Sequence, residues 1–349
     1  MRSQSCIRIA ILLIIFLMHG SDPLFGQSKA LKNPTFKLLS GSYNELQHKW
    51  RSFSTQDKKD FDAFARNYDQ KIGLLGITKS KSDEAKIPRL IHFIWIGPKA
   101  FPAESVANVA SWKKYHPDWK MFFWTDSKDR PCPIEGMELR LIDEINFKQL
   151  KPYISRTNNP GEQADLIRNE LIYEYGGVYV DHDVTCFRSF EKFNIAYDFY
   201  AGLEDPHLNV SQGTRIFPCN CLFGARAGHP ILKSAMDNTE KRWNKIEKKY
   251  PGDSRKNVFN RVIGRTFHSF TLATKKHLSQ NGNVDMVFPS SFFFAHKLFH
   301  KKTIRKLKKA DYVFASHKFA YVWQGVKKEE KKTKHAHGVK KTKKHKKAK

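Results

Sequence analysis

The chain has 349 residues, of which 40% are apolar and 13% aromatic. This composition is typical of a globular protein with a substantial core and excludes a chain that is disordered throughout. The formal net charge is +28, and residues 327–349 alone contain 12 lysines and 2 glutamates. We expect residues 326–349 to form a disordered basic tail. Its charge suits an anionic membrane surface or another polyanion, and the alternative is a solvated tail with no dedicated partner.

An apolar run, Ile9–Met18, follows Arg2 and Arg8 near the beginning of the sequence. It is shorter than the ~20 residues of a membrane-spanning helix and matches the apolar region of a signal peptide. Few small residues suitable for cleavage follow it, so a retained anchor is the alternative. We therefore assign residues 1–28 to a signal peptide or membrane anchor. The protein is expected to be exported or membrane-associated, with the side of the membrane left open.

Residues 29–85 are polar, and their aromatic residues recur at spacings of three or four, as in Phe61, Phe64 and Tyr68. This period is typical of helices that cover a core with one face. We predict a helical N-terminal extension over residues 29–85.

A different pattern begins at Ile87. The sequence predicts a buried strand over 87–97, a helix over 103–115 and a second buried strand over 119–126. Strand, helix and strand within about 40 residues form a βαβ unit, which predicts an α/β fold with a mainly parallel central sheet. A further helix is predicted over 161–175, with Gly176 as its C-cap.

Two aspartates, Asp181 and Asp183, follow the short strand predicted at 178–180. In extended chain, residues two apart face the same side, so His182 would face the other. Two neighbouring carboxylates repel unless a cation lies between them, and oxygen ligands suit Mg²⁺ or Mn²⁺. Ligands of open α/β sheets bind at the carboxyl ends of the strands. Alone, however, an Asp-x-Asp tripeptide is more often a solvated turn.

The neighbouring polar and aromatic residues allow two interpretations. Asp165 and Arg168 are three apart on one helix face, and this spacing alone favours a surface ion pair over a ligand site. Trp95 lies late in a buried strand, which favours a core tryptophan over a ring that stacks on a planar ligand.

In their order along the chain, IHFIWIG and QADLIRNELIYEYGGVYVDHDV resemble the sugar-nucleotide glycosyltransferases that carry a DXD motif in a sugar-binding region. Relatives in that family include yeast-type α-mannosyltransferases, capsule and lipopolysaccharide sugar transferases, and the catalytic domain of clostridial glucosylating toxins. The resemblance covers about residues 87–232. It implies a single nucleotide-sugar-binding domain of the GT-A type, which we place at residues 86–325, with Mn²⁺ or Mg²⁺ as cofactor.

The resemblance also implies roles for individual residues. Trp95 would stack on the nucleotide base, while Asp165 and Arg168 would hold the donor sugar and its phosphate. Asp181 would contact the ribose or sugar and reach the metal through water. Asp183 would bind the metal directly, so that the two aspartates form the catalytic centre.

After the DXD motif the match weakens. Asn220 is a candidate donor contact, with a structural role as the alternative. His317, in FASHKFAYVW, is a candidate third metal ligand, and the alternative is a surface histidine beside Lys318. We expect His229 to cap a helix. The segment Arg265–Leu272 departs from the T-G-P of many relatives, which leaves acceptor binding open.

The expected function is metal-dependent transfer of a hexose, with retention, from a UDP- or GDP-linked sugar to a hydroxyl of a glycan, lipid or protein. Two alternatives stay open: a catalytically inactive module that binds polyanions or glycans, and a nucleotide-sugar hydrolase. No specific nucleic-acid partner is expected, because the sequence carries no RNA-binding motif and no zinc-finger spacing.

Overall fold

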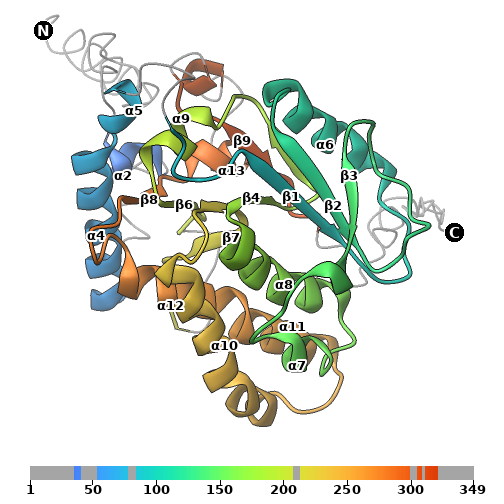
Figure 1. Cartoon of the computed structure of the whole chain (residues 1–349). Helices are drawn as coiled ribbons and strands as arrows, with labels where there is room; N and C mark the ends of the chain where they lie inside the picture. Colours follow the sequence, from blue (N-terminus) through green and yellow to red (C-terminus); the bar gives the residue numbers. More distant parts are fainter. Residues whose placement is uncertain are drawn as a thin grey trace, which may run out of the picture.

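The structure is a computed structural model in which a seven-stranded sheet lies between two layers of helices (Figure 1). The proposed signal or anchor at residues 1–28 and the basic tail at residues 326–349 lie outside the described residues. None of the helices in the described ranges is long and apolar enough to cross a membrane. The structure describes residues 35–40, 53–77, 84–206, 213–298, 305–308 and 311–320.

The order of the strands in the sheet is β3-β2-β1-β4-β7-β6-β8. Strand pairs β1–β2, β2–β3, β1–β4 and β6–β8 are parallel, and β7 pairs antiparallel with both β4 and β6. The predicted α/β fold with a mainly parallel central sheet is therefore confirmed. The strands are β1 Leu90–Trp95, β2 Lys120–Thr125, β3 Glu138–Leu141, β4 Gly177–Val180, β6 Phe199–Leu203, β7 Pro218–Ala225 and β8 Asp285–Phe288.

The predicted βαβ unit is present as β1, α6 (Ala103–Tyr115) and β2, with both strands parallel. Helix α6 buries Val109 and Trp112 completely. The indole N–H of Trp112 donates to the carbonyl of Val184 at 2.9 Å. This bond ties α6 to the backbone that follows the Asp-x-Asp motif, so the crossover helix helps to position that motif.

Helix α8 (Pro160–Tyr175) leads directly into β4. The side chain of Asn159 accepts from two backbone N–H groups of the first turn, and Gly176 ends the helix with φ at +67°, as predicted for a C-cap. A Cβ on Gly177 would lie 2.8 Å from the carbonyl oxygen of Leu90. The glycine pair therefore allows β4 to begin against β1, where a side chain would collide with the neighbouring backbone.

A second, two-stranded sheet joins two segments that lie far apart in the sequence. Strand β5 (Val184–Cys186) pairs antiparallel with β9 (Ala315–His317), with Val184 opposite His317. The register brings His317 beside Asp183, and the backbone N–H of Lys318 donates to the carbonyl of Asp183 at 3.1 Å.

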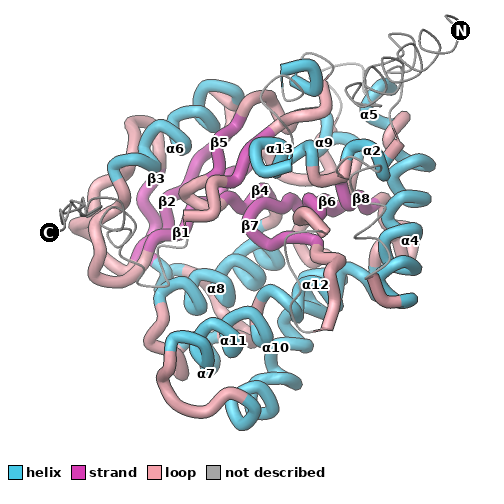
Figure 2. The backbone as a smooth tube through the Cα atoms, turned by 180° about the vertical axis from the view of Figure 1, so that it is seen from behind, coloured by secondary structure: helices cyan, strands magenta, loops and turns pink. Residues whose placement is uncertain are grey.

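The helices cover both faces of the sheet and one of its edges (Figure 2). Helices α8, α10, α11 and α12 lie on one side of the sheet, α6, α9 and α13 lie on the other, and α4 packs beside β8. His229 caps α10, as predicted, by accepting from the N–H of Ile231. The helices not yet defined are α2 Phe36–Leu39, α4 Thr55–Lys71, α5 Leu74–Ile77, α7 Lys151–Ile154, α9 Glu191–Ala196, α10 Pro230–Lys249, α11 Arg255–Arg265, α12 Phe267–His277 and α13 Ser291–Leu298.

The helical pattern predicted for residues 29–85 appears in α2, α4 and α5. On α4, Phe61, Phe64 and Tyr68 are buried. Phe36 of α2 packs edge-on against Phe61, with ring centroids 5.3 Å apart. The aromatic period of this segment therefore covers apolar surface at the β8 edge of the sheet.

Candidate active site

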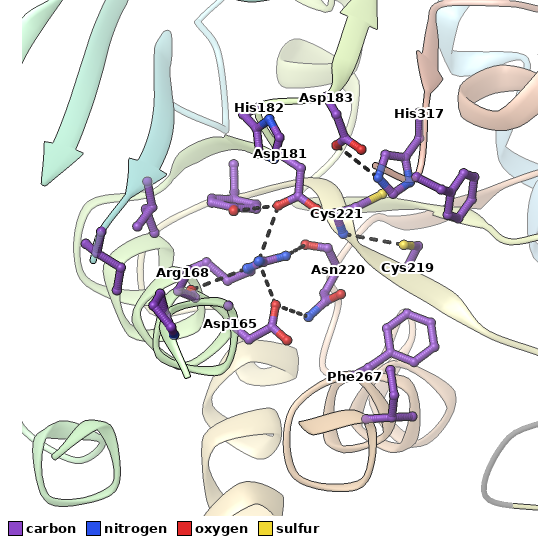
Figure 3. Close-up of a pocket in the computed structure, with 18 of the residues that line it drawn as sticks. Asp165, Arg168, Asp181, His182, Asp183, Cys219, Asn220, Cys221, Phe267 and His317 are labelled. Carbon is purple, nitrogen blue, oxygen red and sulfur yellow. Dashed lines mark hydrogen bonds and ion pairs between the residues drawn. The ribbon is translucent and has the colours of Figure 1, made fainter. Parts of the chain in front are cut away.

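A cavity of about 710 Å³ opens at the carboxyl ends of β1 and β4 (Figure 3). This is the edge of the sheet at which ligands of α/β folds bind, and its volume is in the usual range for small-molecule sites. The residues named from the sequence, scattered over more than 200 positions, all line this cavity: Trp95, Asp165, Arg168, Asp181, Asp183, Asn220 and His317.

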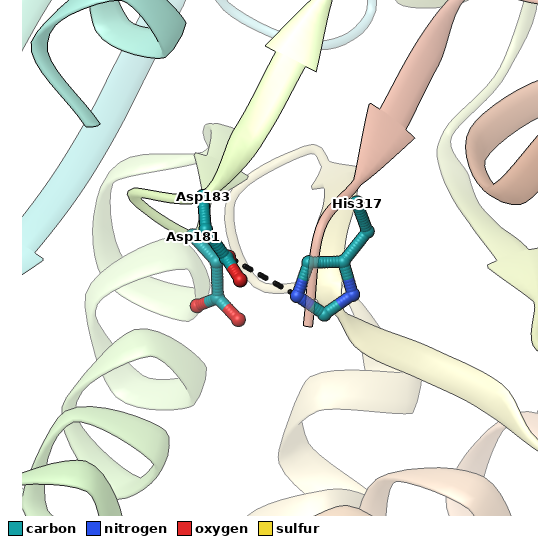
Figure 4. A group of neighbouring side chains, drawn as sticks. All are labelled: Asp181, Asp183 and His317. Atoms are coloured by element: carbon teal, nitrogen blue, oxygen red, sulfur yellow. Dashed lines mark ion pairs between the residues drawn. The ribbon is translucent and has the colours of Figure 1, made fainter. Parts of the chain in front are cut away.

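Asp181, Asp183 and His317 form a cluster at one end of the cavity (Figure 4). One ligand atom from each of them lies within 4.8 Å of the others. The Nε2 atom of His317 is 3.1 Å from the carboxylate of Asp183. The side chain of His317 is only 10% exposed. The interpretation of His317 as a surface histidine is therefore wrong.

The Asp183 carboxylate is stabilised in its charged form. Burial opposes ionisation, but His317 and the N–H of Ala320, which donates at 2.7 Å, outweigh burial and hold the pKa of Asp183 well below its usual range. Burial likewise opposes a charge on His317, whereas the neighbouring Cys221 and Asp183 raise the pKa of His317 well above its usual value. A cation is thus already favoured electrostatically at this position.

This donor set fits a divalent cation. Two carboxylates and one imidazole offer oxygen and nitrogen ligands close enough to meet on one ion. The Nδ1 atom of His317 is buried and makes no hydrogen bond within the described part of the chain. The three residues therefore match Mn²⁺ or Mg²⁺ in donor chemistry, with the imidazole favouring Mn²⁺.

Beneath this cluster, Arg168 links Asp165 and Asp181. Its guanidinium lies 2.6 Å from the Asp165 carboxylate and 3.2 Å from that of Asp181, and it donates to the carbonyl of Asn220 at 2.8 Å. It also lies over the ring of Tyr179, 4.3 Å from the centroid. Arg168 is 5% exposed. The spacing-based interpretation as a surface ion pair is wrong, because β4 and β7 cover this face of α8.

The charges of this buried network are compensated on every side. Burial opposes a charge on Arg168, but Asp165 and Asp181 outweigh burial and raise the pKa of Arg168. The hydroxyl of Tyr179 donates to Asp181 at 2.6 Å, and the hydroxyl of Thr266 donates to Asp165 at 2.7 Å. Compensation of this kind keeps buried ions charged and fixed in one geometry.

Asn220 joins the network through its side chain as well as its backbone. Its Nδ2 donates to Asp165 at 3.4 Å, a long bond. Sequence reasoning missed Tyr179 and Thr266. The alternation of β4 could have indicated Tyr179, which lies two residues before Asp181 and faces the same side. No local signal could have indicated Thr266, which meets Asp165 only because α8 and α12 both pack against α10.

Trp95 lies on the side of the Asp-x-Asp motif that is occupied by His182, away from His317. It is half-buried and lines the cavity. Its indole N–H donates to the carbonyl of Lys99 at 2.8 Å, and the ring of His182 stands edge-to-face with it at 4.9 Å. The Nδ1 atom of His182 is 2.8 Å from the hydroxyl of Ser105. His182 thus faces α6 and Trp95 while the two aspartates lie beside His317. The prediction from strand alternation was wrong in its reason, because the chain turns here and the N–H of Val184 donates to the carbonyl of Asp181 at 3.1 Å.

The wall next to His317 is formed by β7. Cys219 and Cys221 are buried free thiols on this strand. The Cys219 thiol is 3.2 Å from a carboxylate oxygen of Glu204, and Cys221 lies beside His317 (Figure 3). The Cys-x-Cys pair therefore packs against the candidate metal ligands.

Part of this site lies in a segment that is similar to known proteins. The model of the family described as glycosyltransferase sugar-binding region containing DXD motif matches residues 102–200, which include Asp165, Arg168, Asp181 and Asp183. Inositol phosphoceramide mannosyltransferase 1 of Schizosaccharomyces pombe is 27% identical over 177 residues, 50% of this chain and 49% of that protein. Subversion of eukaryotic traffic protein A of Legionella pneumophila is 25% identical over 172 residues, 45% of this chain and 26% of that protein. The chain thus spans about half or less of the length of these relatives.

Among solved structures, the chain is similar to the PaToxG glycosyltransferase, with a TM-score of 0.42, 17% identity and coverage of 65% of this chain and 81% of that one. The catalytic domain of α-toxin from Clostridium novyi aligns with a TM-score of 0.38 and 11% identity over 77% and 82% of the two chains. The family match includes residues that line the cavity and confirms the resemblance seen in the sequence: residues 102–200 are similar to the glycosyltransferase sugar-binding region that contains a DXD motif.

Proposed function

We propose that this protein transfers a hexose from a nucleotide sugar to a hydroxyl group, with a divalent metal held at Asp181, Asp183 and His317. The observation that carries the proposal is the convergence of these three side chains within 4.8 Å, at one end of a cavity and beside a buried arginine. The match of residues 102–200 to the family model supports the reaction class, and the donor, the metal and the stereochemistry are parts of the proposal.

In this proposal Asp183 and His317 bind the metal directly, and Asp181 binds it directly or through water. The bound metal, Mn²⁺ or Mg²⁺, would neutralise the negative charge that develops on the departing diphosphate. The chain's own contribution is a set of charges fixed before the donor binds, which need no rearrangement during the reaction.

Donor binding is assigned to Trp95, Asp165, Arg168 and Asn220. Trp95 presents a half-buried ring to the cavity, which suits stacking on a nucleotide base. Asp165 has carboxylate oxygens that accept sugar hydroxyls, and Arg168 holds Asp165 and Asp181 in place. Arg168 also supplies positive charge close to the position proposed for the diphosphate.

Retention of configuration is part of the proposal. Three acidic side chains that line the cavity already have partners: Arg168 and Thr266 bind Asp165, Tyr179 binds Asp181, and the thiol of Cys219 lies 3.2 Å from Glu204. Such engaged carboxylates are poor nucleophiles, which favours same-face displacement without a covalent glycosyl-enzyme intermediate.

The acceptor class and the location complete the proposal. A hydroxyl on a glycan, lipid or protein would be the acceptor. Three relatives are named inositol phosphoceramide mannosyltransferases, which makes mannose the first sugar to test. We propose that residues 1–28 and the basic tail at residues 326–349 hold the transferase domain near an anionic membrane surface. Residues 29–85 are proposed as an extension of that domain, whose bounds we propose at 86–325.

The test is nucleoside-diphosphate release by the purified full chain. The donors are GDP-mannose, UDP-glucose, UDP-galactose and UDP-N-acetylglucosamine, each with Mn²⁺, with Mg²⁺ and with EDTA. We expect release from one donor that requires metal and is lost in Asp183→Asn. Release without any added acceptor that equals the rate with acceptors would instead indicate a hydrolase. Absence of both turnover and metal-dependent donor binding would refute the enzyme and favour a binding module.

A further inference from the structure

The cavity has two chemically different ends. The cluster of Asp181, Asp183 and His317 and the Arg168 network are at one end. The other end is lined by an apolar wall, which we define as Phe217, Tyr250, Phe259, Ile263 and Phe267. In Figure 3, Phe267 lies on the far side of Asn220 from Asp183 and His317.

The apolar wall follows from the pattern of α11 and the start of α12. Phe259, Ile263 and Phe267 are four residues apart, so they follow one face of the helical segment toward the cavity. On the adjoining face of α11, Val262 is buried. The wall residues of α11 and α12 stay half-buried, because the surface they face is the cavity.

The apolar wall is held in place relative to the polar end. Thr266, between α11 and α12, donates to Asp165 at 2.7 Å. The guanidinium of Arg261 donates to the backbone carbonyl of Tyr250 at 2.7 Å. The rings of Phe217 and Phe267 are in contact, with centroids 5.2 Å apart. These bonds join the wall to the residue assigned to the donor sugar, so the two ends form one preorganised site.

The donor offers no match for this surface. A nucleotide sugar is polar along its ribose, diphosphate and hexose, and its planar base is assigned to Trp95. Half-buried aromatic and aliphatic side chains that face a cavity favour an apolar ligand group, because its transfer from water is favourable. The occupant of the wall is therefore the second substrate or a part of it.

We propose that the apolar wall binds a hydrocarbon chain of the acceptor, so that the acceptor is an amphipathic alcohol of the glycolipid type. The acceptor hydroxyl would point toward Asp181 and Asp183 while the chain lies along Phe259, Ile263 and Phe267. This inference rests on the proposed transferase function and names its acceptor class. It also gives a use to Arg265–Leu272, the segment whose departure from relatives left the acceptor open.

The test is calorimetric binding of methyl, hexyl and octyl β-D-glucosides to the full chain, below the concentrations at which micelles form. The sugar head group is the same in all three ligands, so differences in affinity measure the contribution of the hydrocarbon chain. Each fully buried methylene strengthens binding about fourfold, and we expect octyl to bind about 4- to 16-fold more tightly than hexyl. Equal affinity for hexyl and octyl glucosides would overturn the proposal.

Variants of the wall locate the binding. Ile263→Asn is expected to weaken the binding of octyl glucoside at least about tenfold. Ile263→Phe stays apolar but narrows the cavity, so it should weaken the binding of octyl glucoside more than that of hexyl glucoside. The matched control is Leu272→Asn, which changes a half-buried residue of α12 that does not line the cavity. If the affinity for octyl glucoside were unchanged in both Ile263 variants, its hydrocarbon chain would bind elsewhere, and the proposed role of the apolar wall would be refuted.

Two further measurements separate this inference from the proposed function. Asp183→Asn is expected to keep chain-length-dependent binding while losing diphosphate release. Chain-length-dependent binding without donor turnover in the parent would refute the transferase and leave the wall as an apolar binding site. Turnover that is stimulated by a tyrosine- or serine-containing peptide and not by octyl glucoside would refute the lipid-type acceptor and leave the transferase in place.

Discussion

The two aspartates of the Asp-x-Asp motif are only one residue apart, yet they lie in different environments. Asp181 is bound by Arg168 and Tyr179, a permanent cation and a hydroxyl. Asp183 is bound by His317 and a backbone N–H, so its cationic partner is titratable and approaches from another sheet. The first carboxylate is held by a permanent cation, whereas in the proposed function the second would exchange its contact with His317 for a metal ion.

The largest effect is expected from Arg168→Leu, which removes the cation from the Asp181 environment. Two carboxylates, Asp165 and Asp181, would then lie beside each other in a mostly buried site, and losing one partner of a buried ion pair costs about 3–5 kcal/mol of stability. Urea unfolding measures this loss. Arg140→Leu, at an exposed ion pair with Glu138, is the control and should change stability little. Equal effects of the two substitutions would contradict the structural role of Arg168.

Asp183→Asn tests the other environment. The amide keeps the shape but loses the charge, so we expect Mn²⁺ affinity to fall and diphosphate release to drop roughly 10²–10³-fold, the effect of losing one electrostatic contribution to the transition state. Calorimetry with Mn²⁺ and a single-donor release assay measure the two quantities. Asp129→Asn, on the loop after β2, is the control. Normal metal binding in Asp183→Asn would mean that the ion binds elsewhere.

A third prediction extends the comparison to the histidines. His317 faces a carboxylate, whereas His116 accepts from the N–H of Phe190 at 2.8 Å and has its Nδ1 2.9 Å from the carbonyl of Trp112. Burial lowers the pKa of His116 to about 4. A lowered histidine pKa stabilises the fold above the unfolded value of about 6.5, and this contribution is lost as the pH falls toward 4, up to about 3 kcal/mol.

Urea unfolding between pH 7 and pH 4 measures this effect. His116→Gln should be less stable at pH 7 and should show a weaker decline toward pH 4 than the parent. His277→Gln, at the end of α12, should keep the parental slope. An unchanged slope in His116→Gln would show that other groups cause the acid sensitivity.

The smallest effect is expected from Tyr179→Phe. The change removes the hydroxyl that donates to Asp181 at 2.6 Å but leaves Arg168 in place. A hydrogen bond to a charged group contributes about 1.5 kcal/mol, so we expect a modest loss of stability and about a tenfold loss of donor turnover. Tyr153→Phe, which removes an exposed bond to Glu240, is the control. An effect as large as that of Arg168→Leu would mean that the hydroxyl, and not the guanidinium, holds Asp181.

Much of the fold was predictable from local pattern. The helix over 103–115 was predicted with its observed bounds, and the strand that precedes Asp181 and the C-cap at Gly176 were also correct. These features depend on residues close in sequence, through side-chain period, capping and the conformational freedom of glycine. The same local signals indicated the carboxylates of the site and the family that the sequence resembles.

The sequence by itself determined the parallel βαβ core and the pair Asp181 and Asp183 at the end of a strand. Only the tertiary structure decided that His317 joins them, because that contact depends on the long-range register of β5 and β9. It also decided that Asp165 and Arg168 are buried, since the covering strands come from other parts of the chain. Spacing along a helix specifies which residues share a face, but the packing of distant elements decides whether that face meets water, protein or a cavity.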